Sequence, residues 1–185
     1  VYFRHNDMAH LEQCLMRADE QEEVDTMKRG GKFVPQPRYV VAEGLYKDNG
    51  SVALLPQLLF LKQAYRARLI LDESFALGCI GSRGRGTCDY WGVDASSIDV
   101  ICGSMECGLA AVGGFAVGSF EVIEHQILRA TGYIFSASLP PYACATASAA
   151  LRVIDSDCAK GDDSFAASGS PASGKGASSK GKKGK

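Results

Sequence analysis

Two carboxylates stand where apolar runs of the chain end. Residues 39–42 are followed by Glu43, and the apolar residues 69–71 are followed by Asp72. In open α/β sheets, ligands gather at the carboxyl ends of the strands. A carboxylate there is costly to bury unless a cation or a hydrogen-bond donor meets it. A protonated pyridine nitrogen would stabilise Asp72, and so would the following turn or an arginine, so the pattern alone leaves these alternatives open.

A glycine-rich stretch follows the second carboxylate. Glycines recur at positions 78, 81, 84 and 86, with Arg83 and Arg85 between them. The stretch lacks the G-K-[ST] ending of a phosphate loop and the G-x-G-x-x-G of a dinucleotide-binding turn. We therefore expect a turn at which the backbone passes close to a cofactor or a partner subunit, with an arginine facing an anion.

A metal site is not expected from the cysteines and histidines. Seven cysteines contain no C-x-x-C pair, and the three histidines lie far from any cysteine pair in the sequence. Zinc sites need ligands clustered at short spacing. The composition instead favours reduced thiols, most of them buried in the core.

The elements that must position these groups alternate between helix and strand. Apolar runs predict strands at residues 39–42, 68–71, 99–102 and 114–117, and helical spacing predicts helices at residues 8–20, 56–65, 121–129 and 142–154. Residues 22–37 carry loop chemistry. Nearly continuous apolar strands that alternate with helices predict an α/β fold, a mostly parallel sheet with helices on both faces.

The composition divides the chain into a body and a tail. The 185 residues are 46% hydrophobic and 22% charged, which suits one modest domain over residues 1–155. Residues 156–185 are rich in Gly, Ser and Lys, and we expect them to be disordered and solvated, without a nucleic-acid partner. The chain starts at Val1 without an initiator Met or a signal-peptide core, and no window is apolar enough to cross a bilayer, which suggests a fragment or a processed piece.

Three motifs resemble the α-oxoamine synthase family of fold-type I pyridoxal phosphate (PLP) enzymes. The segment 41–86 resembles that family's strand ending in Glu, its turn, its proline-started helix and its D-E-A-H-S-x-G run ending in G-R-G. FSASLPP at residues 135–141 and FRHND at residues 3–7 resemble two further family segments. The resemblance implies part of the large domain of a PLP-dependent transferase, with PLP as the cofactor.

The sequence departs from this family at two positions. The family's D-E-A-H histidine is replaced by Phe75, and the segment that carries the family's PLP-bonding lysine corresponds to residues 103–114, where Cys107 or Glu106 takes the lysine's place. No lysine occurs between Lys62 and Lys160. Because neither a thiol nor a carboxylate replaces an amine in covalent PLP binding, we expect no catalytic residue on this chain.

Within the family, a scaffold without the lysine is similar to the non-catalytic subunits of serine palmitoyltransferase. The resemblance implies a heterodimer with the lysine-bearing long-chain-base subunit 2, which binds PLP covalently and condenses L-serine with palmitoyl-CoA to 3-ketosphinganine. It also implies the cytosolic face of the endoplasmic reticulum membrane, with membrane association through a segment absent from this chain. The alternatives are an autonomous α-oxoamine synthase and a non-enzymatic interaction scaffold.

The same resemblance assigns four residues to the cofactor: Asp72, Ser104, Ser136 and Ser138. By position, Ser136 and Ser138 would donate hydrogen bonds to a phosphate held mainly by the partner subunit. Alternatively, their hydroxyls only satisfy local backbone groups ahead of Pro140. Asp72 would face the pyridine ring, or would remain as a relic that holds the interface by pairing with an arginine.

Overall fold

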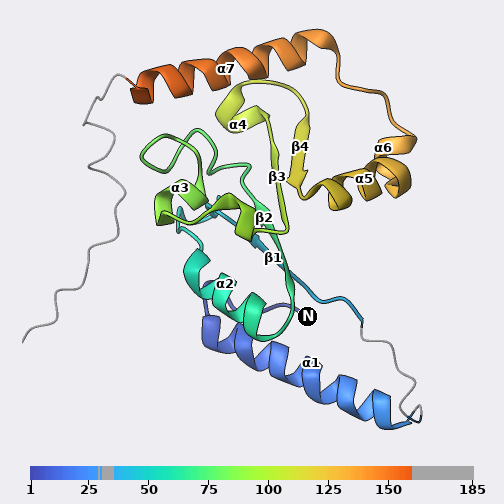
Figure 1. Cartoon of the computed structure of the whole chain (residues 1–185). Coiled ribbons are helices and arrows are strands. Elements are labelled where there is room, and N and C mark those ends of the chain that lie inside the picture. The colour runs from blue at the N-terminus through green and yellow to red at the C-terminus, as the bar shows by residue number, and fades with distance from the viewer. Residues whose placement is uncertain (29, 31–35, 160–185) are drawn as a thin grey trace, which may run out of the picture.

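The computed structural model describes residues 1–28, 30 and 36–159, and it contains a four-stranded sheet (Figure 1). The strands, in sheet order, are β1 (Tyr39–Glu43), β2 (Arg68–Asp72), β3 (Val100–Ser104) and β4 (Gly114–Gly118). The first three are parallel, and β4 runs antiparallel to β3. The predicted α/β class with a mostly parallel sheet is confirmed.

In Figure 1, α1 and α2 lie below the sheet, and α4 and α7 lie above it, at the end where β3 stops. The helices are α1 (Met8–Lys28), α2 (Leu55–Ala64), α3 (Thr87–Trp91), α4 (Glu106–Leu109), α5 (Phe120–Arg129), α6 (Thr131–Ile134) and α7 (Pro141–Ala159), and a 3₁₀ turn spans Ala95–Ser97. Pro56 stands in the first turn of α2, where its missing N–H and fixed φ suit a helix start.

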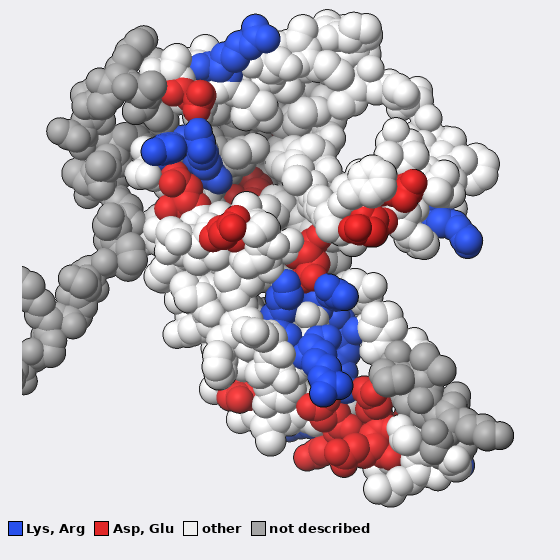
Figure 2. Space-filling view, viewed as in Figure 1, with Lys and Arg blue, Asp and Glu red and all other residues white. Residues whose placement is uncertain are grey.

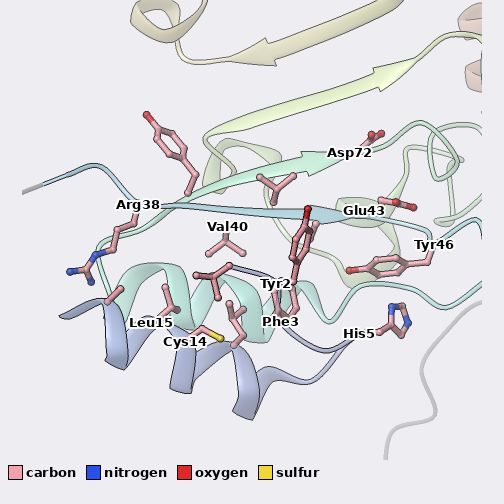
Figure 3. A pocket seen from close by; sticks show the side chains of 16 residues that line it. Tyr2, Phe3, His5, Cys14, Leu15, Arg38, Val40, Glu43, Tyr46 and Asp72 are labelled. Carbon is pink, nitrogen blue, oxygen red and sulfur yellow. The ribbon is translucent and has the colours of Figure 1, made fainter. Parts of the chain in front are cut away.

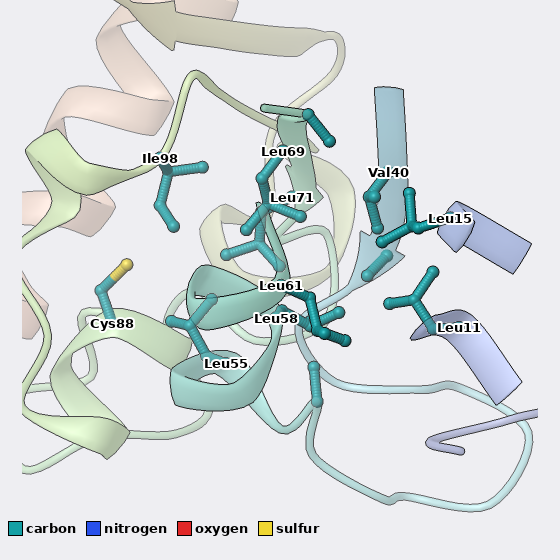
Figure 4. Packing of buried hydrophobic residues seen from close by; sticks show 13 residues of the cluster. Leu11, Leu15, Val40, Leu55, Leu58, Leu61, Leu69, Leu71, Cys88 and Ile98 are labelled. Atoms are coloured by element: carbon teal, nitrogen blue, oxygen red, sulfur yellow. The ribbon is translucent and has the colours of Figure 1, made fainter. Parts of the chain in front are cut away.

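The main core lies between the β1–β2 pair and helices α1 to α3 (Figure 4). Side chains alternate between the faces of a strand, so one face of β2 contributes Leu69 and Leu71, both fully buried. Val40 on β1 packs with them, and Leu11 and Leu15 cover this layer from α1. A second, smaller cluster joins α4 to α7 through Leu109 and Ala147.

The amino ends of the strands are fixed by one carboxylate. Asp99 lies next to Lys62 at 2.6 Å and Arg68 at 2.8 Å, and it accepts the backbone N–H of Leu69. Burial alone would raise the pKa of Asp99, but these hydrogen bonds lower it overall. This cluster holds β2 beside the start of β3 and leaves the carboxyl ends free to form a site.

Two helices extend beyond their predicted ends. The prediction of a loop from residue 22 is wrong up to Lys28, because α1 continues through that stretch. Arg38 pairs with Asp19 and Glu22 and so ties the second half of α1 to the start of β1. Helix α7 continues to Ala159 instead of stopping at residue 154. The rest of the predicted tail, residues 160–185, lies outside the described residues.

Among residues 1–28, 30 and 36–159, no helix combines the length and the apolarity that crossing a membrane requires.

Candidate functional site

The carboxyl ends of the three parallel strands bring the predicted polar groups together. The strand register pairs Glu43 with Asp72, and Asp72 with Cys102. Asp72 therefore lies at the end of a strand that has neighbours on both sides. A cavity of about 710 Å³ opens here, and its polar lining includes Asp72, Ser74, Cys102 and Ser104. The edge predicted from the sequence is thus assembled as one site.

Asp72 is half-buried and organises the turn that follows it. Its Oδ1 accepts the backbone N–H of Ser74 at 2.8 Å. The hydroxyl oxygen of Ser74 in turn accepts the backbone N–H of Ser104 at 2.8 Å, which links the end of β2 to the end of β3. The predicted turn-capping role of Asp72 is therefore present, while its role toward a pyridine ring stays a prediction.

Glu73, next to Asp72, is a buried carboxylate at the site that sequence reasoning did not select. Its side chain is only 4% exposed, and both carboxylate oxygens accept the backbone N–H of Thr87, at 3.0 and 3.3 Å. Burial raises the pKa of Glu73, and the hydrogen bonds from Thr87 only partly offset that. Glu73 therefore closes the loop of residues 74–86 onto the strand end and acts as a positioning group.

Two glycines leave the space that Glu73 and Thr87 fill. A Cβ on Gly86 would stand 2.0 Å from Oε2 of Glu73, and a Cβ on Gly44 would stand 2.1 Å from Oγ1 of Thr87. Gly86 also has φ +83°, which disfavours other residues. Gly44 follows β1 and Gly86 precedes α3, so the two glycines that surround Glu73 and Thr87 are far apart in the sequence.

The positions predicted to replace the family's lysine lie on the short helix α4. Both Glu106 and Cys107 are exposed. Ser104 accepts the backbone N–H of Glu106 through its hydroxyl at 3.1 Å, which starts the helix. A Cβ on Gly108 would stand 1.9 Å from the carbonyl oxygen of Leu77, so α4 packs directly on the loop that follows β2. The segment therefore adjoins the loop that leads from Asp72.

Two lysines of the sheet region are already engaged by other groups. Lys62 contacts Asp99 at the opposite, amino end of the strands. Lys47 places Nζ 5.6 Å from the ring centroid of Phe75, the residue at the family's histidine position. This is a cation–π contact, and an aromatic ring here cannot make the hydrogen bonds of an imidazole.

Ser136 and Ser138 lie apart from the other predicted cofactor residues. Both are exposed, in the stretch between α6 and α7, and neither lines the cavity at Asp72. Within the described part of the chain, neither hydroxyl forms a hydrogen bond. The alternative in which they satisfy local backbone groups therefore has no support in this structure, and their contact with a phosphate stays a prediction.

The expectation that most thiols are buried is wrong. Of the six cysteines described, Cys88 alone is buried, whereas Cys79, Cys107 and Cys144 are exposed. The exposed ones lie on loops and helices that little of this chain covers. Burial raises the pKa of the Cys88 thiol to about 11, and burial together with the charge of Asp72 raises the pKa of Cys102.

No group of three or more metal-ligating side chains occurs in the parts the structure describes.

The glycine-rich loop is bonded to α3 and α7 through two of its residues. Arg85 pairs with Asp155 of α7 at 2.9 Å, and the backbone N–H of Arg83 is donated to Asp89 at 2.6 Å. The loop is thus held against α3 and α7 at the same end of the molecule as the cavity.

The fold and the site are consistent with one class of protein. A mostly parallel sheet with an aspartate at the carboxyl end of a central strand fits part of the large domain of a PLP-dependent transferase. Residues 1–165 match the family "Aminotransferase class I and II". The chain belongs to this family.

Two individual relatives show which kind of enzyme within this family the chain resembles. The chain is 40% identical over 154 residues to serine palmitoyltransferase 1 of Dictyostelium discoideum, covering 83% of this chain and 30% of that protein. It is 41% identical over 155 residues to long chain base biosynthesis protein 1 of Arabidopsis thaliana, covering 84% of this chain and 30% of that protein. The chain thus spans about 30% of the length of these relatives.

The solved structures agree with these relatives. A variant of serine palmitoyltransferase from S. paucimobilis, with PLP and myriocin bound, superposes with a TM-score of 0.69 at 30% identity. The match covers 85% of this chain and 36% of that structure.

Proposed function

We propose that this chain is part of the non-catalytic subunit of serine palmitoyltransferase. In this role it forms a heterodimer with a lysine-bearing long-chain-base subunit 2, and the pair condenses L-serine with palmitoyl-CoA to 3-ketosphinganine, releasing CO₂ and CoA. The complex acts at the cytosolic face of the endoplasmic reticulum membrane. The names of the relatives support the assignment to serine palmitoyltransferase. The missing lysine supports the proposal that the partner subunit binds PLP covalently.

The observation that carries the proposal is an assembled site without an amine to bond the cofactor. The strand-end aspartate and its turn are in place, yet no lysine occurs between Lys62 and Lys160, and Glu106 and Cys107 occupy the segment where one is needed. Lys62 is held by Asp99 at the far end of the sheet. Covalent binding of PLP therefore has to come from the partner.

The residues present fit one end of PLP. A carboxylate at the position of Asp72 suits the protonated pyridine nitrogen, and the cavity beside it is lined by Ser74 and Ser104 as further polar groups. When bound, PLP supplies an electron sink that stabilises a carbanion. The cavity lining contains no lysine or arginine, so we expect the phosphate to be held by groups outside this cavity.

Ser136 and Ser138 are the groups of this chain that suit a shared site. Their hydroxyls are exposed and unpaired within the described residues, so they are available to a neighbouring subunit. Hydroxyl groups donate well to phosphate oxygens. We infer that one of them donates to the phosphate of PLP held by the partner.

The test is co-expression of the chain with a lysine-bearing subunit 2, followed by affinity purification of the complex. Serine-dependent release of CoA from palmitoyl-CoA is then measured for the complex and for each subunit alone. We expect activity from the complex and none from this chain alone. Failure to co-purify, or activity of subunit 2 that this chain does not change, would contradict the proposal.

Two variants separate the parts of the proposal. Asp72→Asn tests the strand-end carboxylate, and the double change Ser136→Ala with Ser138→Ala tests the phosphate contact. We expect the double variant to co-purify normally but to lose PLP from the complex on gel filtration. Unchanged PLP content would show that these hydroxyls do not hold the phosphate of PLP. Asp155→Asn, in the exposed pair with Arg85, is the matched control for loss of a surface polar group.

A further inference from the structure

The cavity of about 710 Å³ at the carboxyl ends of the strands, here called the strand-end cavity, combines one negative charge with an apolar wall. Among the described residues that line it, Asp72 is the only lysine, arginine, histidine or carboxylate. The Oδ1 atom of Asp72 accepts the N–H of Ser74, whereas Oδ2 has no hydrogen-bond or ion-pair partner within the described residues. Oδ2 is therefore free to accept a hydrogen bond from a cation that enters the cavity.

The apolar wall of the strand-end cavity comes from α5 and α6. Ile123, Gln126 and Ile127 of α5 line the cavity, together with Tyr133 of α6. Ile127 is 45% exposed and Tyr133 is 63% exposed, so the chain itself does not cover this wall. Covering these side chains with hydrocarbon is favourable, because it removes apolar surface from water.

The floor of the strand-end cavity is formed by β3 and β4. The strand register pairs Cys102 with Ala116, and Ser104 with Gly114, and all four residues line the cavity. Because Ala116 and Gly114 carry little or no side chain, the floor leaves room for a run of methylene groups. The volume lies in the range of sites for small molecules.

Asp72 also borders a second cavity, of about 900 Å³, on the β1 side of the strand ends (Figure 3). Figure 3 shows Glu43 near Asp72, at the end of the neighbouring strand. Glu43 and Arg38 both line this second cavity, so a cation there would meet a second carboxylate and a guanidinium. Glu43 does not line the strand-end cavity, which makes the two spaces distinguishable by one substitution.

We propose that the strand-end cavity binds a long-chain primary amine, with its ammonium at Oδ2 of Asp72 and its hydrocarbon chain along Ile123 and Ile127. The ammonium supplies the positive charge that the lining lacks, and the chain covers the wall of α5. An anionic amphiphile meets the like charge of Asp72, and an uncharged one leaves that carboxylate without a cation.

The physiological ligand of the cavity rests on the proposed function, whereas the binding itself does not. The condensation product 3-ketosphinganine is a long-chain primary amine, so it has the chemistry that this cavity selects. An ammonium and a pyridine ring exclude each other at Asp72. The product therefore competes with the cofactor ring at this strand end and slows its own formation.

The test is isothermal titration calorimetry of the 185-residue chain at pH 7 with propylamine, hexylamine and decylamine, each below its micelle concentration. We expect the affinity to rise by up to about fourfold for each methylene group that becomes buried. Decanol and decanoate match decylamine in length, and both should bind at least about tenfold more weakly, because they bring no cation to Asp72.

Three variants assign the binding to its residues. Asp72→Asn keeps an oxygen for the N–H of Ser74 and should weaken decylamine binding at least about tenfold. Glu43→Gln is the matched control at the neighbouring strand end and should change the affinity by less than about twofold. Ile127→Ala, at an exposed wall position, should weaken decylamine about tenfold and leave propylamine unchanged. Circular dichroism confirms that each variant is folded.

Three results would overturn the proposal. Equal affinities for decylamine and decanol would mean that the charge of Asp72 is not recognised. Loss of binding in Glu43→Gln but not in Ile127→Ala would place the amine in the second cavity. Absence of decylamine binding at millimolar concentration would show that the strand-end cavity accepts no such ligand. None of these measurements involves release of CoA, so the proposed function is tested separately.

Discussion

The β1–α2–β2 unit and the region from α5 to α7 differ sharply in how much apolar surface they bury. Leu69 and Leu71 are fully buried, and α2 contributes three further buried leucines. Helix α5 has no buried residue, and Phe120 and Phe135 are 74% and 84% exposed. The first region therefore contains its own core, whereas the second presents apolar surface of the kind that marks an interaction site.

This difference bears on how a shared site is built. Asp72 stands at the end of a strand whose packing this chain provides, so the carboxylate is positioned without a partner. Ser136 and Ser138 stand in the exposed stretch between α6 and α7. Under the proposed function, the first region carries the preorganised part of the site and the second is the region available to contact the partner.

Charge is unevenly distributed on the visible face (Figure 2). Acidic side chains gather in the lower part of the view, over α1, beside a group of basic side chains. The ion pairs of Arg38 with Asp19 and Glu22 join α1 to the start of β1. Helix α5 carries both acidic and basic side chains, whereas most of α7 is uncharged. A largely uncharged helix face is suited to burial against another protein surface.

The largest expected effect comes from the core of the first region. Leu69→Ala removes a fully buried side chain and should lower the free energy of unfolding by about 3 kcal/mol. The matched control is Leu128→Ala on α5, where the side chain is 66% exposed and the loss should stay below about 0.5 kcal/mol. Urea unfolding followed by circular dichroism measures both. Equal losses would remove the distinction between the regions.

The next effect concerns the buried carboxylate beneath the site. Gly86→Ala should destabilise the chain by about 2 to 3 kcal/mol, because the new Cβ meets Glu73 and the backbone has φ +83°. Gly50→Ala has a similar φ of +67° but open space around it, so it should cost only about 1 kcal/mol. Thermal unfolding of both variants gives the difference. If the two variants melt together, Glu73 does not hold this loop in place.

A smaller effect is expected at the amino ends of the strands. The pKa of Asp99 is lowered in the folded chain, so its stabilisation is present above the ordinary range near pH 4 and is lost as the pH falls through the lowered value. Asp99→Asn should cost about 1 to 2 kcal/mol at pH 7 and should reduce the loss of stability below pH 5. Urea unfolding at several pH values tests this. If Asp99→Asn lost as much stability below pH 5 as the unchanged chain, the stabilising role of the Asp99 carboxylate would be contradicted.

The smallest effect belongs to the link between the glycine-rich loop and α7. Arg85 and Asp155 are 56% and 71% exposed in their pair, so Asp155→Asn should change stability by less than about 0.5 kcal/mol at any salt concentration. A larger loss, measured in the same unfolding assay, would mean that α7 is attached more firmly than its exposure indicates.

The sequence was sufficient to predict the strands and their common edge. Each strand is a short apolar run, and the run ends at a charged or polar residue such as Glu43 or Asp72. The apolar pattern and the residue that ends it therefore indicate the same strand end. The end of α1 was missed because residues 22–28 are mostly polar. Their helix is supported by the contact of Glu22 with Arg38, which is distant in sequence.

Other features depend on tertiary contacts that no local pattern reveals. Glu73 was overlooked because its importance arises from Thr87 and from the glycines on either side of it, at positions 44 and 86. Cysteine exposure was predicted wrongly because composition says nothing about which surfaces the chain itself covers. The antiparallel direction of β4 likewise depends on the short connection through α4, which an apolar run does not encode.

The central claim is that this chain assembles a strand-end site but cannot bond its cofactor. The most direct measurement is incubation of the purified chain with equimolar PLP, reduction with borohydride, and mass spectrometry of the peptides. A PLP-bound serine palmitoyltransferase, treated identically, is the positive control. We predict a stoichiometric adduct in the control and none in this chain; a stoichiometric adduct at a single lysine of this chain would contradict the account.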